Sequence, residues 1–305
     1  MAQAFRPAIA RLKPCATAEV AAMWRRPSGL RWHGRQGPQM MDEEFEPAVL
    51  TDEERDRFGR DRFLVVDRPV VPLGETADAR AILADLFARF DRLPADLAYD
   101  LGEVKHHDGA QQIPEINCTT EIEPRLAATA AVRRCRDLAR QILGHRAVLV
   151  FDHAICKPAG VSAAVEWHQD LAYANPDADF SRQVHIWLAL QDVTEDNGCL
   201  RYIPNQGRGL LPHHRRGNSR GAQALVADGV DQRAALSYPL RAGMVAVHRM
   251  TTLHSSGPNT TDTPRLAWVF HFRDPGPVWA KTRLRAGLSK VRHPFRRRHH
   301  GLREP

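Results

Sequence analysis

The stretch VEWHQDLAY (Val165–Tyr173) decides how the rest of this sequence is interpreted. It is expected to be a β-strand, in which residues two apart point to the same face of a sheet. His168 and Asp170 would then project together, and Gln169 would point away. An imidazole and a carboxylate arranged in this way can supply two adjacent ligands to one metal ion. The stretch therefore predicts a metal site whose third ligand comes from another part of the chain.

His254 is the best candidate for that third ligand, because it lies in TTLHSSGPN, just after an expected strand. Two histidines and one carboxylate on one face of Fe(II) leave three open positions, the arrangement associated with non-haem iron oxygenases. Arg265 follows His254 by eleven residues and begins the next expected strand. In an oxygenase of this type that uses 2-oxoglutarate as co-substrate, the distal carboxylate needs a fixed cation nearby. The planar guanidinium of Arg265 could bind this carboxylate, and Ser256 could add a hydroxyl donor.

Regular structure is expected to change from helices to strands along the chain. A capping box, Thr51 with Glu54, opens a short helix through Phe58, and the run Arg62–Val70 follows as a strand. Apolar stripes predict longer helices from about Thr76 to Arg92 and from Pro124 to Gly144. The later apolar runs predict strands at Val148–Ile155, Val184–Leu190, Cys199–Ile203, Met244–Val247 and Leu266–Phe272. This order indicates an α+β fold, with a mainly β core of antiparallel sheet against which the helices pack.

Three local features complete the expected layout. Asn197-Gly198 lies between two expected strands and is the strongest hairpin signal in the chain. Residues 206–238 are rich in Arg, Gly and His without a clear pattern, which predicts a long insertion between strands. His248 and His271 lie within expected strands and are expected to be core or pocket residues rather than metal ligands.

Composition excludes several classes of protein. Of the 305 residues, 43% are hydrophobic and 26% are charged, which is ordinary for a soluble chain. No apolar run approaches the roughly 20 residues of a membrane-spanning helix. Five cysteines without a C-x-x-C pair fit neither a disulfide framework nor a zinc knuckle, and no secretory signal is evident. The expected location is therefore cytoplasmic.

The positive net charge of +7 is concentrated in the two ends of the chain. Residues 1–40 hold seven basic residues and one acidic residue, and residues 281–305 hold nine and one. The remaining residues, 41–280, have 27 basic and 34 acidic side chains, a net charge of −7. We therefore expect a disordered N-terminal extension (1–40), a single domain (41–280) with an insertion at about 206–238, and a basic C-terminal tail (281–305).

Four stretches resemble the phytanoyl-CoA dioxygenase family of Fe(II)- and 2-oxoglutarate-dependent oxygenases. They are VLTDEERDRFGRDRFLVV (Val49–Val66), WHQD (Trp167–Asp170), LALQDVTEDNGCLRYIP (Leu188–Pro204) and LHSSGPNTTDTPR (Leu253–Arg265). The resemblance covers about Val49 to Asp274. It implies a double-stranded β-helix, a cupin-like jelly roll flanked by helices.

The resemblance also implies a set of site residues and a reaction. His168, Asp170 and His254 would bind Fe(II), and Arg265 with Ser256 would bind 2-oxoglutarate. Trp187 and Lys157 stand where family members often line the pocket for co-substrate or substrate. The implied reaction uses O2 to convert 2-oxoglutarate to succinate and CO2 while it hydroxylates an unactivated C–H bond of a small organic substrate.

Two alternatives remain open at this point. The same iron centre could catalyse desaturation, epimerisation or cyclisation in natural-product metabolism. From a different class, a non-catalytic protein could associate with nucleic acid through the basic ends of the chain. The complete set of ligands and the net charge of −7 over residues 41–280 argue against nucleic acid as a partner. A small-molecule substrate is expected, and the oligomeric state is open.

Overall fold

A computed structural model describes residues 45–102, 111–160, 163–174, 180–204, 209–215 and 224–276. The expected N-terminal extension (1–40) and C-terminal tail (281–305) lie outside these residues. The described chain combines helices with antiparallel sheets, which confirms the expected α+β class. The helices are α2 (Asp52–Asp61), α3 (Leu73–Phe87), α4 (Thr119–Ile122), α5 (Pro124–Ala127) and α6 (Ala130–Leu143), with short 3₁₀ helices η1 (Phe90–Arg92), η2 (Asp170–Tyr173) and η3 (Gln232–Ala234).

The strands form a large sheet, a small sheet and a two-stranded ribbon, and every pair is antiparallel. The order in the large sheet is β1 (Phe63–Val66), β11 (Val245–Arg249), β6 (Gln183–Ala189), β13 (Arg265–Arg273), β4 (Val148–Lys157), β3 (Pro114–Asn117) and β2 (Ala98–Asp100). The small sheet has the order β10 (Leu236–Tyr238), β7 (Leu200–Tyr202), β12 (His254–Ser256) and β5 (Val165–His168). The ribbon pairs β8 (His213–Arg215) with β9 (Leu225–Ala227).

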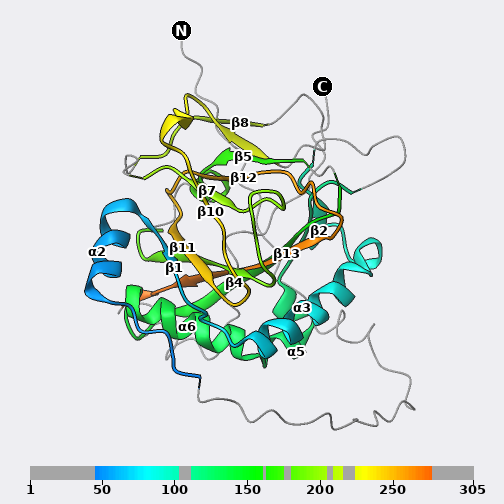
Figure 1. Ribbon diagram of the computed structural model, residues 1–305, viewed down its shortest axis with the longest axis horizontal. Coiled ribbons are helices and arrows are strands. Elements are labelled where there is room, and N and C mark those ends of the chain that lie inside the picture. Colours follow the sequence, from blue (N-terminus) through cyan, green and yellow to red (C-terminus); the bar gives the residue numbers. More distant parts are fainter. Residues whose placement is uncertain are drawn as a thin grey trace.

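The elements are stacked in layers (Figure 1). Helices α3, α5 and α6 lie along one face of the large sheet, and the small sheet lies over its other face. Strand β13 shows how the sequence separates the two faces, since its side chains alternate. Leu266, Trp268, Phe270 and Phe272 belong to the core shared with the helices, whereas Ala267 and Val269 pack in a second core with residues of the small sheet.

The helical layer differs from its prediction in two places. The helix expected from about Thr76 to Arg92 is α3, Leu73–Phe87, followed by the separate 3₁₀ helix η1. The expected helix from Pro124 to Gly144 is divided into α5 and α6 by the residues around Thr129. The backbone N–H of Ala130 donates to the Glu75 carboxylate of α3 at 2.7 Å, so a neighbouring helix supplies the acceptor at the start of α6. The Thr51–Glu54 capping box is confirmed at the start of α2, which extends to Asp61. None of the helices in the described ranges is long and apolar enough to cross a membrane.

The strand predictions overlap observed strands, but the predicted hairpin is wrong. Asn197-Gly198 connects β6 of the large sheet to β7 of the small sheet, so the chain crosses between sheets there. Gly198 has φ +85°, and a Cβ at this position would lie 2.6 Å from the carbonyl oxygen of Gly257. The predicted insertion, 206–238, is also not without structure: it contains β8, β9 and β10, and β10 is an edge strand of the small sheet.

Candidate metal centre

Strand pairing brings two of the expected ligands together. His254 begins β12 and is the direct cross-strand partner of His168, the last residue of β5. Their ring centroids are 4.2 Å apart. The strand expected through Tyr173 ends at His168, and Asp170 is instead the first residue of η2. This turn still brings its carboxylate to the two imidazoles, while Gln169 points away and hydrogen-bonds to Gly209 and Thr251.

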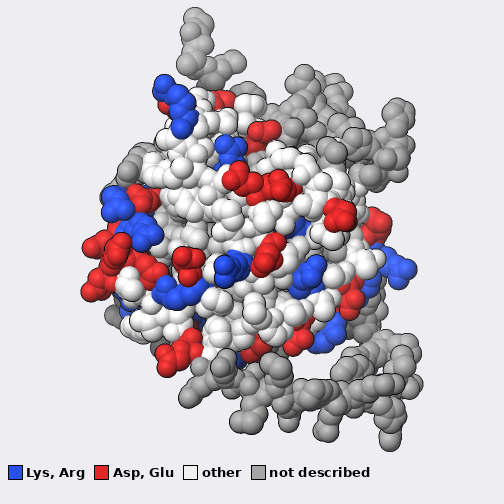
Figure 2. Space-filling view, viewed as in Figure 1, with Lys and Arg blue, Asp and Glu red and all other residues white. Residues whose placement is uncertain are grey.

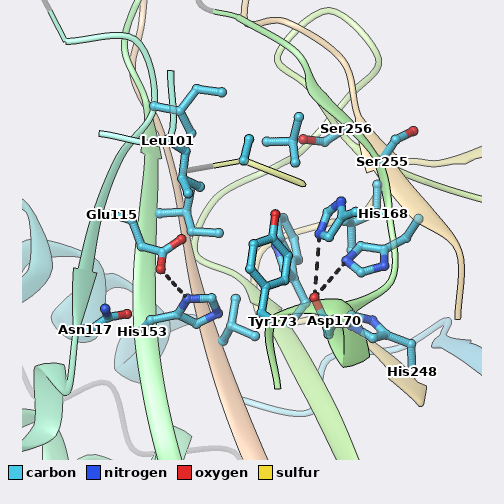
Figure 3. A pocket seen from close by; sticks show the side chains of 18 of the residues that line it. Leu101, Glu115, Asn117, His153, His168, Asp170, Tyr173, His248, Ser255 and Ser256 are labelled. Atoms are coloured by element: carbon cyan, nitrogen blue, oxygen red, sulfur yellow. Dashed lines mark hydrogen bonds and ion pairs between the residues drawn. The ribbon is translucent and has the colours of Figure 1, made fainter. Parts of the chain in front are cut away.

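The three side chains have the spacing of ligands around one ion. Oδ1 of Asp170 lies 3.5 Å from Nε2 of His168 and 3.7 Å from Nε2 of His254. Two ligand atoms at right angles, each about 2.1 Å from a metal ion, would be about 3 Å apart. A small inward movement is therefore enough for these atoms to share an ion (Figure 3).

The backbone orients both imidazoles for this role. Nδ1 of His168 lies 2.8 Å from the carbonyl oxygen of Glu166, and Nδ1 of His254 lies 3.0 Å from that of Thr252. A carbonyl oxygen can only accept, so each Nδ1 carries the proton and each Nε2 keeps its lone pair. The two lone pairs face the Asp170 carboxylate, which is the donor set that a divalent transition metal requires.

The second oxygen of Asp170 is occupied by two further histidines. Oδ2 accepts hydrogen bonds from Nδ1 of His185 at 2.6 Å and Nε2 of His248 at 3.1 Å. Nδ1 of His248 lies 2.8 Å from the hydroxyl of Tyr202. The distance from His185 is shorter than the edge between two ligands of one ion and is that of a charge-assisted hydrogen bond. We therefore assign His185 and His248 to the orientation of Asp170 rather than to a second metal site.

The ionisation of these residues favours metal binding. Burial by itself would raise the pKa of Asp170, but the electrostatic attraction of the surrounding imidazoles, His254 and His185 first, and the hydrogen bond from His185 outweigh it and hold this pKa well below its ordinary value. Burial, reinforced by the neighbouring His168, holds the pKa of His254 well below its ordinary range. A carboxylate and a neutral imidazole are the forms that bind metals.

Arg265 lies on the wall of the same cavity and has incomplete hydrogen bonding. Its guanidinium donates to the carbonyl oxygens of Asn197 and Gly198, both at 3.3 Å, and lies 5.4 Å from the centroid of the Trp187 ring. The side chain is fully buried, yet Nη1 has no hydrogen-bond partner and no carboxylate pairs with the guanidinium within the described ranges. Burial lowers the pKa of Arg265 only to about 10, so it is a cation at neutral pH.

The other predicted pocket residues divide into two groups. Ser256 and Trp187 line the cavity together with Arg265. Lys157 is buried but is not among the residues of this wall, and its Nζ donates to the carbonyl oxygens of Ala163 at 3.0 Å and Gly257 at 2.5 Å. Burial, with the nearby charge of Arg265, lowers the pKa of Lys157 to about 6. Lys157 thus links two loop segments behind the site.

The cavity lies between the two sheets and has room for more than one small molecule. It encloses about 1110 Å³ of empty space, including its open mouth. The small sheet contributes His168, His254 and Ser256, and the large sheet contributes residues of β3, β4, β6, β11 and β13. Glu115, Asn117 and His153 lie across the cavity from His168 and Asp170 (Figure 3). Glu115, Asn117 and His185 were not predicted from the sequence; for His185, the available signal was a polar residue within an apolar strand.

Comparison with known proteins agrees with this geometry. The model of the family "Phytanoyl-CoA dioxygenase (PhyH)" matches residues 60–267. Phytanoyl-CoA dioxygenase domain-containing protein 1 of Bos taurus is 26% identical over 166 residues, which cover 52% of this chain and 56% of that protein. The chain spans about half the length of the curated relatives that it matches.

Two solved structures have similar folds. EvdO2 of Micromonospora carbonacea var. aurantiaca, in complex with 2-oxoglutarate, is 29% identical with a TM-score of 0.63, covering 74% of this chain and 92% of that one. The epimerase SnoN, in complex with Fe3+, alpha-ketoglutarate and nogalamycin RO, is 22% identical with a TM-score of 0.58, covering 81% and 94%, and shows the fold alone. Because the family model matches more than half of the length of this chain, the chain belongs to the phytanoyl-CoA dioxygenase family.

Proposed function

We propose that the protein is an Fe(II)- and 2-oxoglutarate-dependent oxygenase that hydroxylates an unactivated C–H bond of a small organic molecule. His168, Asp170 and His254 hold the iron in this proposal. Arg265, with Ser256, binds the distal carboxylate of 2-oxoglutarate. The observation that carries the proposal is a buried guanidinium without an acidic partner among the described residues, on the wall of the same cavity as three convergent metal ligands.

The electrostatics of Arg265 support an anionic ligand. A buried charge without a partner is strongly unfavourable. An unpaired buried cation is therefore expected where an anionic ligand binds and pairs with it. The nitrogen without a partner, Nη1, belongs to a planar fork that matches a carboxylate. Trp187 restricts the guanidinium from one side. A related structure, EvdO2, contains 2-oxoglutarate.

When bound, iron with 2-oxoglutarate and O2 would supply the oxidising chemistry, with succinate and CO2 released. The residues of this chain bind and orient. His185 and His248 hold one oxygen of Asp170, so the other oxygen stays directed at the metal position. The apolar parts of the two sheets exclude water from the space beside the three ligands.

The wider assignments follow from the same reasoning. The facing sheets support a double-stranded β-helix, and we assign the catalytic domain to residues 41–280, with 1–40 and 281–305 as extensions. The enclosed cavity supports a small-molecule substrate. On the face shown in Figure 2, basic and acidic side chains are interspersed, which does not favour a polyanion such as nucleic acid as the partner.

The test is an anaerobic titration of the protein with Fe(II) and 2-oxoglutarate. We expect the weak visible charge-transfer band of the bidentate complex. Arg265→Ala should weaken 2-oxoglutarate binding by about 100-fold, as expected for loss of one partner of a buried ion pair, with iron affinity nearly unchanged. Arg146→Leu is the control, since Arg146 pairs with Asp274 outside the cavity.

Absence of the band from folded protein would overturn the iron assignment, and equal loss of iron and 2-oxoglutarate in Arg265→Ala would make Arg265 structural. Screening compounds for stimulated succinate formation, followed by mass measurement of the product, tests the reaction. Hydroxylation adds one oxygen atom, desaturation or ring closure removes two hydrogens, and epimerisation leaves the mass unchanged.

A further inference from the structure

A group of polar side chains on the large sheet has no role in binding iron or 2-oxoglutarate. Tyr99 of β2, Glu115 and Asn117 of β3 and His153 of β4 all line the cavity, and we call them the β3 polar wall. They lie across the cavity from His168 and Asp170 (Figure 3). Glu115 and Asn117 are each only 6% exposed, although both are polar. A substrate placed beside the three ligands would therefore lie against this wall.

Hydrogen bonds fix the direction in which the wall can interact. Nδ2 of Asn117 donates to the hydroxyl of Tyr99 at 3.2 Å, and this hydroxyl donates to the Glu115 carboxylate. The Tyr99 hydroxyl has one proton, which it donates to Glu115, so it can only accept from Asn117. The NH2 group of the Asn117 amide must therefore face Tyr99. Oδ1 of Asn117 is then buried without a hydrogen-bond donor among the described residues. The wall therefore has a buried acceptor that no described residue satisfies.

The charge of the wall favours a neutral ligand. Nδ1 of His153 lies 3.2 Å from Oε1 of Glu115. Burial opposes protonation of His153, but the Glu115 charge outweighs it and raises the pKa of His153. The carboxylate thus already faces the Tyr99 hydroxyl and the His153 imidazole, and an added ammonium group would compete with both for it. A hydroxyl group both donates and accepts, so it suits Asn117 and His153 without a change in charge.

We infer that the β3 polar wall binds hydroxyl groups of the substrate, and that the substrate is a neutral polyhydroxylated ring compound such as a sugar or cyclic polyol. Apolar residues beside the wall, Leu101, Ile113 and Val269, would contact the C–H face of such a ring. This inference rests on the proposed function, because it concerns the molecule held opposite the iron.

The test compares three classes of ring compound as ligands of the full chain loaded anaerobically with Fe(II) and 2-oxoglutarate. The neutral probes are myo-inositol, methyl glucoside and cis-cyclohexane-1,2-diol; the charged probes are cyclohexylamine and cyclohexanecarboxylate. Binding to the loaded protein is measured by perturbation of the charge-transfer band. Binding to the metal-free protein is measured separately by saturation-transfer NMR. At least one neutral probe should bind about tenfold more tightly than either charged probe.

Two variants locate the interaction. Asn117→Leu should weaken binding of the neutral probe by about tenfold, the cost of an unmade hydrogen bond, with an unchanged 2-oxoglutarate band. Glu115→Gln should change this binding by no more than about threefold, because Glu115 faces Tyr99 and His153 and the hydroxyl contacts are assigned to Asn117 and His153. If Asn117→Leu does not fold, a loss of about tenfold or more in Glu115→Gln would overturn the inference. An ammonium site would instead lose affinity most strongly in Glu115→Gln.

Three further outcomes overturn the inference: tightest binding of the amine or the carboxylate, no binding of any neutral probe, or equal binding by wild type and Asn117→Leu. Each of these would leave the charge-transfer band intact, so the proposed function would stand. Loss of the band from the wild type would instead overturn the proposed function, while binding to the metal-free protein would still report on the wall.

Discussion

The two ends of the cavity differ in how completely their polar atoms are satisfied. At Asp170, one oxygen accepts from His185 and His248, and the other faces His168 and His254. At Arg265, the hydrogen bonds are long, and one nitrogen has no partner in the described part of the chain. The proposed metal ligands are thus oriented in advance, whereas the hydrogen bonding is incomplete at the end proposed for the co-substrate.

The difference has an energetic meaning. Ligands that are already oriented lose little freedom when an ion binds, which favours affinity. An incomplete cationic end destabilises the ligand-free protein, and this cost is recovered when an anion arrives. Removal of polar groups should therefore have opposite effects at the two ends. At Asp170 it should lower the affinity for the metal ion, and at Arg265 it should raise the stability of the ligand-free protein.

The largest effect is expected from Asp170→Ala. This change removes a ligand and also leaves the N–H groups of His185 and His248 without their acceptor. Affinity for Fe(II) should fall by more than about 100-fold, beyond the range for residues that only orient a ligand. Anaerobic equilibrium dialysis measures the affinity. Retention of affinity within tenfold would show that Asp170 is not a ligand.

Arg265→Leu should separate binding from stability. Replacement of an unpaired buried cation by an apolar residue should raise the free energy of unfolding of the ligand-free protein by about 1–4 kcal/mol. Addition of 2-oxoglutarate should then stabilise the wild type but not the variant. Urea denaturation with and without the keto acid gives both values. A less stable ligand-free variant would contradict the contrast between the two ends.

His248→Phe should produce an intermediate effect. The substitution removes one hydrogen bond to Asp170 and the contact with the Tyr202 hydroxyl, while a ring remains to fill the space. Fe(II) affinity should fall by about 10–100-fold without loss of folded protein. Tyr202→Phe, which leaves the bond to Asp170 in place, is the matched control and should change affinity less. Equal losses in both variants would point to packing rather than orientation.

The smallest effect is expected at an ion pair outside the cavity. Arg68 pairs with Glu54 at 2.7 Å, and this hydrogen bond lowers the pKa of Glu54 from 4.5 despite the opposing effect of burial. The pair's contribution should be complete above pH 4.5 and disappear as the pH falls through the lowered pKa. Arg68→Ala should therefore cost about 0.2–1 kcal/mol at pH 7 and less at pH 3. Urea denaturation at both values checks this, and a larger difference at pH 3 would be contrary to it.

Part of the candidate metal site was predictable because its information is local. The pair His168 and Asp170 lies within one short stretch, and His254 pairs directly with His168 in the next strand of the small sheet. Asp170 lies on a 3₁₀ turn instead of the expected strand, yet it still meets both histidines. The spacing of these residues was therefore more informative than the structure assigned to them.

His248 and His271 lie buried on the cavity wall, as expected, but the contacts of the supporting residues were not predictable, because they depend on register between distant strands. His185 is opposite His248 on one side and His271 on the other, although 63 residues separate the first two and 23 the last two. Asn117 is opposite His153 for the same reason. The predicted hairpin at Asn197-Gly198 failed in a similar way, since a turn sequence does not reveal whether its two strands belong to one sheet.

The alternation along β6 also constrains how this protein can fold and change. A one-residue slip against β11 and β13 would turn His185 and Trp187 toward the helices and push Ile186 and Leu188 into the cavity. The same error would thus damage the apolar core and the proposed catalytic face at once. A chain with this mispairing should consequently fail to fold stably, rather than form a stable protein with a faulty active site.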